Sequence, residues 1–184
     1  PLQENCTLLY ANNQAILIDP GDEAQRLLQI LKDKSLTLEA IWLTHAHFDH
    51  IGAIAELQET LGGIPVYLHP NDDMLFENGH LAAAHWEIPF KQPTAKPLVL
   101  ADNQVLKFST QDIHCLFTPG HAPGHIAFYI PSQNAVIAGD ALFRGSIGRT
   151  DLPMGNHQQL LESIRSRLFT LPDETVVYPG HGPS

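Results

Sequence analysis

Cysteine is scarce in this 184-residue sequence, which contains only Cys6 and Cys115. Two cysteines cannot form a disulfide framework, and a structural zinc site rich in cysteine is excluded. Both lie in apolar stretches that predict strands, so we interpret them as small core residues. Their scarcity favours a reducing compartment, and we expect the protein to be cytoplasmic. Because the sequence begins at Pro1 rather than at methionine, a cleaved targeting segment stays an open alternative.

Basic residues and long apolar runs are also few. Ten lysines and arginines stand against 20 aspartates and glutamates, which gives a formal net charge of -10. This charge argues against a nucleic acid or an anionic membrane as the main partner, and no apolar run approaches the length of a membrane span. The apolar fraction of 43% is still ample for a core. We therefore expect a single domain over residues 1–184.

Short apolar runs alternate with a few amphipathic stretches. The runs that predict strands are Cys6–Tyr10, Gln14–Asp19, Ala40–Leu43, Val66–Leu68, Val105–Phe108, Ile113–Phe117, Ile126–Ile130, Ala135–Ala138 and Val176–Tyr178. The stretches that predict helices are Asp22–Lys34, Ile51–Leu61 and Asn156–Phe169, whereas Asn71–Trp86 is irregular or helical and Pro89–Pro97 is a loop. This order favours two packed sheets with helices outside them.

The segment Thr44–His50 is the most informative part of the sequence. It follows a predicted buried strand and contains His45, His47, Asp49 and His50. In an extended backbone, residues two apart face the same way, so His45 and His47 can bind one metal ion. Asp49 and His50 come at the turn into a helix, where neighbouring side chains diverge. This second pair can therefore serve another ion nearby.

Three more polar clusters each begin where an apolar strand ends. They supply His121, Asp140 and His181, whereas His125 is interpreted as a buried, hydrogen-bonded histidine. The candidate ligands then number seven, which suits two ions that share one ligand. The natural division places His45, His47 and His121 on one ion, and Asp49, His50 and His181 on the other. Asp140 would bridge the two ions together with a water or hydroxide.

The motif set resembles the metallo-β-lactamase superfamily, most closely its glyoxalase II (hydroxyacylglutathione hydrolase) branch and the short bacterial proteins of that branch. The matching words are Asn5-Cys6, Asp19-Pro20-Gly21, Thr44–His50, Thr118–His125, Gly139-Asp140 and Gly148–Asp151. The resemblance implies an α+β fold, an αββα four-layer sandwich with metals at one edge of the two sheets. It also implies the ligand role of each of the seven residues.

The activity that this resemblance implies is hydrolysis of a thioester such as S-D-lactoylglutathione. A hydroxide that bridges two divalent metal ions would attack the carbonyl, with Asp140 as the bridge and Asp49 as a ligand that can also accept the proton of the nucleophile. Zinc is the expected metal, and iron and manganese are alternatives because imidazole and carboxylate accept all three. The partner would be a small-molecule thioester, including glutathione conjugates.

Two departures from glyoxalase II concern substrate binding. The sequence ends three residues after His181 and does not contain the C-terminal helical domain of full-length enzymes. In place of their Gly-Lys-Phe-Tyr segment, it has Gly148–Asp151. Arg149 can replace the lysine as a substrate-binding residue, with a surface salt bridge to Asp151 as the alternative, whereas the tyrosine has no counterpart. Asp19 has two interpretations as well, a turn residue or a residue that orients a ligand histidine.

Persulfide dioxygenases, which use one iron, also resemble this sequence and share the Gly-Arg-Thr-Asp word. In that alternative, His45, His121 and Asp140 would form a two-histidine, one-carboxylate iron site. The residue before Gly148 favours the hydrolase, because it is Ile147 where the dioxygenases have cysteine.

Overall fold

The computed structural model describes residues 2–184, and two five-stranded sheets form its centre. The first sheet has the order β1 (Thr7–Ala11), β2 (Gln14–Ile18), β3 (Thr37–Trp42), β4 (Val66–Leu68) and β5 (Leu98–Val99). The second has the order β12 (Val176–Pro179), β9 (Ala135–Gly139), β8 (Ile126–Ile130), β7 (Gln111–Phe117) and β6 (Val105–Phe108). A short hairpin of β10 (Leu142–Phe143) and β11 (Ser146–Ile147) follows β9.

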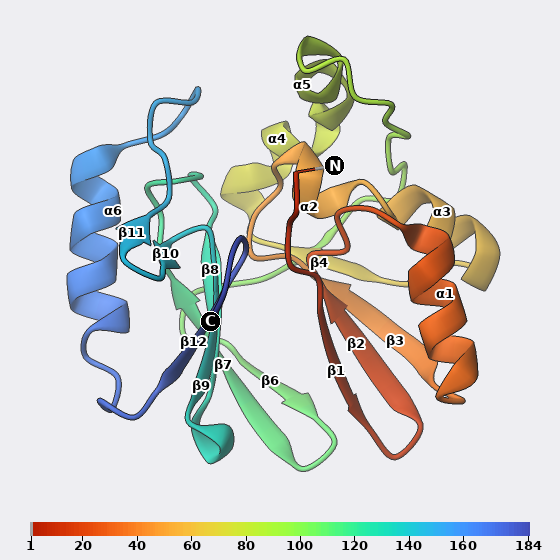
Figure 1. Ribbon diagram of the computed structural model, residues 1–184, viewed down its shortest axis with the longest axis horizontal. Helices are drawn as coiled ribbons and strands as arrows, with labels where there is room; N and C mark the ends of the chain where they lie inside the picture. Colours follow the sequence, from red (N-terminus) through yellow and green to blue (C-terminus); the bar gives the residue numbers. More distant parts are fainter. Residues whose placement is uncertain (1) are drawn as a thin grey trace.

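Helices cover the outer faces of both sheets (Figure 1). The longer ones are α1 (Ala24–Asp33), α3 (Ile54–Leu61) and α6 (His157–Ser163), and α6 continues into the π-helical η3 (Ile164–Leu168). Shorter elements are α2 (Phe48–Ile51), α4 (Asp73–Glu77), α5 (Gly79–His85) and the 3-10 turns η1 (Pro70–Asp72) and η2 (Pro131–Gln133). Within residues 2–184, no helix is long and apolar enough to cross a bilayer.

Three apolar clusters bind these layers together. In β2, successive residues face opposite sides of the sheet, so Leu17 packs toward the helices and Ile16 toward the second sheet. Between the sheets, Trp42 contacts Phe128 with ring centroids 5.7 Å apart. A third cluster joins the second sheet to α6 and includes Leu160. The chain therefore has the predicted αββα four-layer sandwich of the metallo-β-lactamase fold.

Most expected elements are present, with differences that have local causes. The helix predicted for Ile51–Leu61 is divided into α2 and α3, because the Ala53 N–H donates to Pro20 O at 3.0 Å rather than within a helix. Gly52 packs against the same turn, where a Cβ would come within 2.3 Å of Gly21 O. The region Asn71–Trp86 is helical. Cys115 is buried and Cys6 half-buried against the core, and both are free thiols, as expected.

Candidate metal centre

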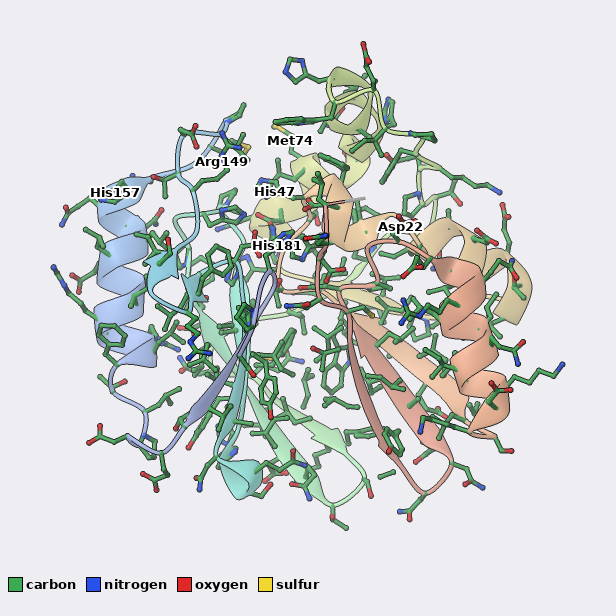
Figure 2. The ribbon with its side chains drawn as sticks, in the orientation of Figure 1. Asp22, His47, Met74, Arg149, His157 and His181 are labelled. Atoms are coloured by element: carbon green, nitrogen blue, oxygen red, sulfur yellow. The ribbon has the colours of Figure 1, made fainter. Side chains whose placement is uncertain are left out.

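The seven predicted ligands meet at one edge of the two sheets, because each follows the end of a strand. His45 and His47 lie in the loop after β3, and Asp49 and His50 lie in α2. His121 follows β7, and Asp140 and His181 follow β9 and β12. Since β9 and β12 are parallel and Gly139 is opposite Pro179, the last two ligands emerge side by side. Figure 2 shows His47 and His181 at this edge, between Arg149 on the α6 side and Asp22 on the α1 side.

His45, His47 and His121, which we call the three-histidine group, point their ring nitrogens at one another. His47 Nδ1 lies 3.1 Å from His45 Nε2 and 2.9 Å from His121 Nε2. Three neutral rings that aim nitrogens at one point can bind a cation there, whereas their lone pairs would otherwise face each other. The loop after β3 and the loop after β7 come from different sheets, so this group joins the two halves of the sandwich.

Asp49, His50 and His181, which we call the aspartate-histidine group, form a second cluster. One ligand atom from each of these residues lies within 4.8 Å of the others. His181 Nε2 is 3.3 Å from Asp49 Oδ2. The His50 side chain is buried, and that of His181 is 28% exposed, so this cluster opens to solvent on the His181 side.

Asp140 lies between the two groups. Its Oδ2 is 3.4 Å from His121 Nε2 and 3.6 Å from His181 Nε2, and its Oδ1 is 3.5 Å from His50 Nε2. Within residues 2–184, Asp140 Oδ1 and His50 Nε2 are buried without a hydrogen-bond partner. Buried polar atoms without partners are costly, so two of them facing each other among imidazoles and carboxylates fit a cation. The cluster has the donor chemistry of a metal-binding site.

Asp19 orients one histidine of each group. It accepts hydrogen bonds from His50 Nδ1 at 3.0 Å, from the Thr44 hydroxyl at 2.6 Å and from the Thr44 backbone N–H at 2.7 Å. Because the Thr44 hydroxyl donates to Asp19, it accepts from His45 Nδ1, which lies 3.0 Å away. Both rings therefore carry the proton on Nδ1 and turn a lone pair on Nε2 toward the centre. Of its two interpretations, the structure favours the orienting residue.

Burial and charge shift the pKa values of these groups in a consistent way. Burial lowers the pKa of His45 well below its ordinary value and that of His47 to about 3. Burial acts in the same direction on His50, but the carboxylates of Asp140 and Asp19 outweigh it and raise that pKa well above its ordinary value. Burial would raise the pKa of Asp140, but His50 and the other imidazoles lower it. The three-histidine group thus offers neutral rings, whereas the carboxylates of Asp140 and Asp19 surround His50 with negative charge.

This arrangement can be compared with known proteins. The sequence matches the family described as "Metallo-beta-lactamase superfamily" over residues 1–181. The chain belongs to the metallo-β-lactamase superfamily.

Two curated relatives in this superfamily are named as hydrolases. The chain is 44% identical over 186 residues to "Probable metallo-hydrolase YqgX" of Bacillus subtilis, and the match covers 100% of the chain and 87% of that protein. It is 35% identical over 191 residues to "Hydroxyacylglutathione hydrolase GloC" of Haemophilus influenzae, with 98% of the chain and 86% of that protein covered. The chain is therefore an enzyme of the metallo-hydrolase type, and the glyoxalase II-like resemblance is confirmed.

A solved structure supports metal binding in this fold. "Crystal structure of TTHA1623 in a di-iron-bound form" superposes with a TM-score of 0.92 at 46% sequence identity, and the match covers 100% of this chain and 89% of that one. That protein binds two iron ions.

His125 has the buried, hydrogen-bonded environment that its sequence context predicts. Its Nε2 accepts the backbone N–H of Asp140 at 3.1 Å, so its Nδ1 carries the proton and lies 2.8 Å from Thr118 Oγ1. Both ring nitrogens are thus occupied, and burial lowers the pKa of His125 to about 3. This member of the metallo-β-lactamase superfamily therefore uses His125 to hold the backbone of Asp140.

Arg149 has two contacts that the sequence could not separate. Its backbone carbonyl accepts a hydrogen bond from His121 Nδ1 at 2.8 Å, which orients a ring of the three-histidine group. Its guanidinium makes two hydrogen bonds to Asp151, at 2.7 and 2.8 Å, and is about half exposed. The salt bridge to Asp151 is present, and the substrate-binding role stays a prediction.

Two buried carboxylates were missed from the sequence. Asp72 accepts backbone N–H groups from Ala46, at 3.1 Å, and from Gly124, and so ties the ligand loops of the two sheets together. Burial raises its pKa to about 7. Glu4 lies 4.0 Å from His50, and burial raises its pKa to about 9. Asp72 follows the end of β4, the same position as the predicted ligands, and that is the signal that could have found it. For Glu4, no sequence signal indicates burial.

Proposed function

We propose that this protein hydrolyses a thioester of the S-D-lactoylglutathione type at a centre that holds two divalent metal ions. The observation that carries the proposal is Asp140, which stands between two complete ligand groups with its Oδ1 facing His50 Nε2 and neither atom paired. One ion fits the three-histidine group and the other fits the aspartate-histidine group. A single ion would leave one of these groups without a cation.

The residues have distinct roles in this proposal. Divalent cations at such a centre lower the pKa of water and polarise a carbonyl, which supplies the nucleophile and stabilises the oxyanion. Asp140 holds both ligand groups to a common centre, and Asp49 accepts the proton of the attacking water. Because a thiolate leaves readily, no strong general acid is required. Water adds to the carbonyl carbon, the carbon–sulfur bond breaks, and the products are a carboxylic acid and a thiol.

Arg149 is proposed to bind the anionic part of the substrate. The chain has only ten basic residues, and the backbone of this one touches the ligand His121. Binding an anion would require the guanidinium to exchange Asp151 for the substrate, which an exposed ion pair permits at little cost. The name of the GloC relative supports a glutathione conjugate. We propose zinc as the metal, one catalytic domain over residues 1–184 and a cytoplasmic location.

The test combines metal analysis with parallel assays of the purified protein. Elemental analysis without added metal should find two zinc ions for each chain. Thiol release from S-D-lactoylglutathione should exceed hydrolysis of a β-lactam, and glutathione persulfide should cause no oxygen uptake. Asp140→Asn should remove most of the thiol release, whereas Asn78→Ala, at an exposed site in the α4–α5 turn, should not. Absence of thioester hydrolysis in metal-saturated protein would contradict the proposal.

An alternative is a mononuclear iron dioxygenase that acts on glutathione persulfide. One feature favours it, which is the clustering of His45, His121 and Asp140 beside the Gly148–Asp151 segment. The ring centroids of His45 and His121 lie 4.8 Å apart. Two nitrogens and one carboxylate on a single ion suit iron and oxygen chemistry. One iron for each chain, together with oxygen uptake and no thioester hydrolysis, would select this alternative.

A further inference from the structure

Among the described residues, His181, whose side chain is 28% exposed, lacks the outer hydrogen bond that holds three of the other predicted ligand histidines, and His47 lacks one as well. The outer ring nitrogens of His45, His50 and His121 each bond to a protein group. In the described chain, residues 2–184, no hydrogen-bond acceptor meets Nδ1 of His181, and its Nε2 faces only carboxylates of the centre. Apart from the ring of Phe143, whose centroid lies 6.3 Å from that of His181, no outer partner in this range orients the ring. Its position depends on the backbone that carries it.

That backbone is the end of β12 at Pro179 and the loop of Gly180, His181 and Gly182 that follows it, which has almost no side chains to anchor it. A Cβ on Gly180 would come within 2.2 Å of Asp140 Oδ1, so this position must be glycine for the loop to approach the centre. Gly182 has φ of 76°, a conformation that favours glycine. Hydrogen bonds must therefore hold the loop, and one of them joins Gly180 N to Gly139 O at 2.7 Å.

Asn5 supplies most of the remaining hydrogen bonds. Its side-chain amide donates to Gly182 O at 2.7 Å and to Pro179 O at 3.1 Å, on either side of His181. Its backbone N–H donates to Gly180 O at 2.7 Å. The preceding residue, Glu4, forms an isolated antiparallel β-bridge with His181 itself. Residues 4 and 5 thus pair with the whole ligand loop, although they lie at the other end of the chain.

We propose that Asn5 is a positioning residue for His181 and that it sets the affinity of the aspartate-histidine group for its metal ion. The hydrogen bonds of Asn5 all go to the loop after β12, and none goes to the loops of the three-histidine group. Loss of the amide should therefore weaken one metal site and leave the other intact. Outer hydrogen-bond partners of metal ligands typically change metal affinity about 10- to 100-fold.

The inference rests on the two-metal centre of the proposed function, and its test measures metal content without substrate. Apo-protein is prepared for wild type, Asn5→Ala, His181→Ala and Asn78→Ala, and is then dialysed against a series of free Zn²⁺ concentrations. The control Asn78→Ala makes the same chemical change, because Asn78 Nδ2 also donates to a backbone carbonyl, that of Met74 at 2.8 Å. Elemental analysis gives the ions bound for each chain, and crystals grown at limiting Zn²⁺ show which group has lost its ion.

Asn5→Ala should bind its first ion as the wild type does and its second about 10-fold more weakly or worse. It should empty the same group as His181→Ala, with a smaller effect, and Asn78→Ala should match the wild type. If circular dichroism shows that Asn5→Ala does not fold, Asn5→Ser keeps one donor and should show the same selective loss in reduced size. Wild-type affinity for both ions, or equal weakening of both, would overturn the inference. A selective loss in a protein without thioesterase activity would uphold it while refuting the proposed function.

Discussion

The two ligand groups at this sheet edge differ in how firmly hydrogen bonds hold their side chains. In the three-histidine group, His45 is buried and bonded to Thr44, and His121 is bonded to the backbone of Arg149. In the aspartate-histidine group, only His50 has such a partner, and the His181 side chain is 28% exposed. Two of the three rings in the first group are thus fixed by outer hydrogen bonds, whereas, in the described part of the chain, His47 bonds only within the group. The second group relies on His50 and on a loop that the N-terminal segment holds.

This difference follows from where the groups lie in the sandwich. The three-histidine group joins loops from both sheets over the inter-sheet core, and Asp72 bonds to both loops. The other group lies at the margin, where the last strand of the chain, β12, forms the edge of its sheet. A site at a margin has fewer neighbours to fix its ligands. Two metal sites only one carboxylate apart can thus differ in affinity.

The largest effect is expected from a change of Asp140, the residue that the two ligand groups share. Asp140→Asn replaces the carboxylate between the groups by a neutral amide, which cannot bridge two dications. We expect both metal sites to weaken and kcat to fall about 100-fold or more, which corresponds to about 2.7 kcal/mol of activation free energy. Metal analysis and thioester hydrolysis measure the two effects.

His125→Ala is the matched neighbour for that experiment. His125 bonds to the backbone of Asp140 but offers no free lone pair to a metal. This variant should lower the free energy of unfolding, while its metal content should stay close to that of the wild type. Two bound metals and near-normal turnover in Asp140→Asn would refute the bridging role.

Stepwise chelation should separate the two groups directly. The holoenzyme is titrated with a chelator. We expect the ion of the aspartate-histidine group to leave first, at about 10-fold lower chelator concentration. The reason is that His181 is partly exposed and lacks an outer hydrogen bond within the described chain. The metal retained for each chain, with a crystal structure at the midpoint, gives the order. Simultaneous loss of both ions, or earlier loss from the three-histidine group, would show that the groups do not differ in the proposed way.

Asp72→Asn tests the tie between the loops of the three-histidine group. An amide can accept from only one of the two backbone N–H groups and turns its own NH₂ toward the other, so we expect a loss of about 1–3 kcal/mol in unfolding free energy. Burial raises the pKa of Asp72 to about 7, so its protonated form is the one favoured in the folded state. The stability it contributes is full below its unfolded pKa and is lost as the pH rises through about 7.

Urea unfolding of apo-protein at several pH values from 5 to 8 tests whether the stability contributed by Asp72 falls as the pH rises. The stability advantage of wild type over Asp72→Asn should shrink as the pH rises. Asp102→Asn is the contrasting control, because hydrogen bonds from Phe117 N–H and Arg167 outweigh partial burial and lower the pKa of Asp102. Its contribution is lost only in acid, so the effect of Asp102→Asn should be flat over this range. A flat profile for Asp72→Asn would contradict the assignment.

The sequence predicted which residues gather at this edge better than it predicted the contacts that hold them. His45, His47, Asp49 and His50 form a contiguous motif whose chemistry can be recognised without a structure. Strands with three or more apolar positions were equally visible, whereas two-residue strands such as β10 are too short to show a pattern. The side chain of Asp72 is buried only because loops from positions 46 and 124 close over it, and no local pattern encodes that encounter.

The smallest expected effect concerns Arg149, whose two contacts act on different parts of the centre. Arg149→Ala removes the guanidinium but keeps the backbone carbonyl that orients His121. The three-histidine group should therefore keep its ion, while KM for S-D-lactoylglutathione rises about twofold to fivefold with little change in kcat, as for an exposed charge contact. The matched variant Asp151→Asn releases the guanidinium from its present partner and should lower KM. Steady-state kinetics at low salt measure both. Unchanged KM in both variants would show that Arg149 serves this centre through its backbone alone.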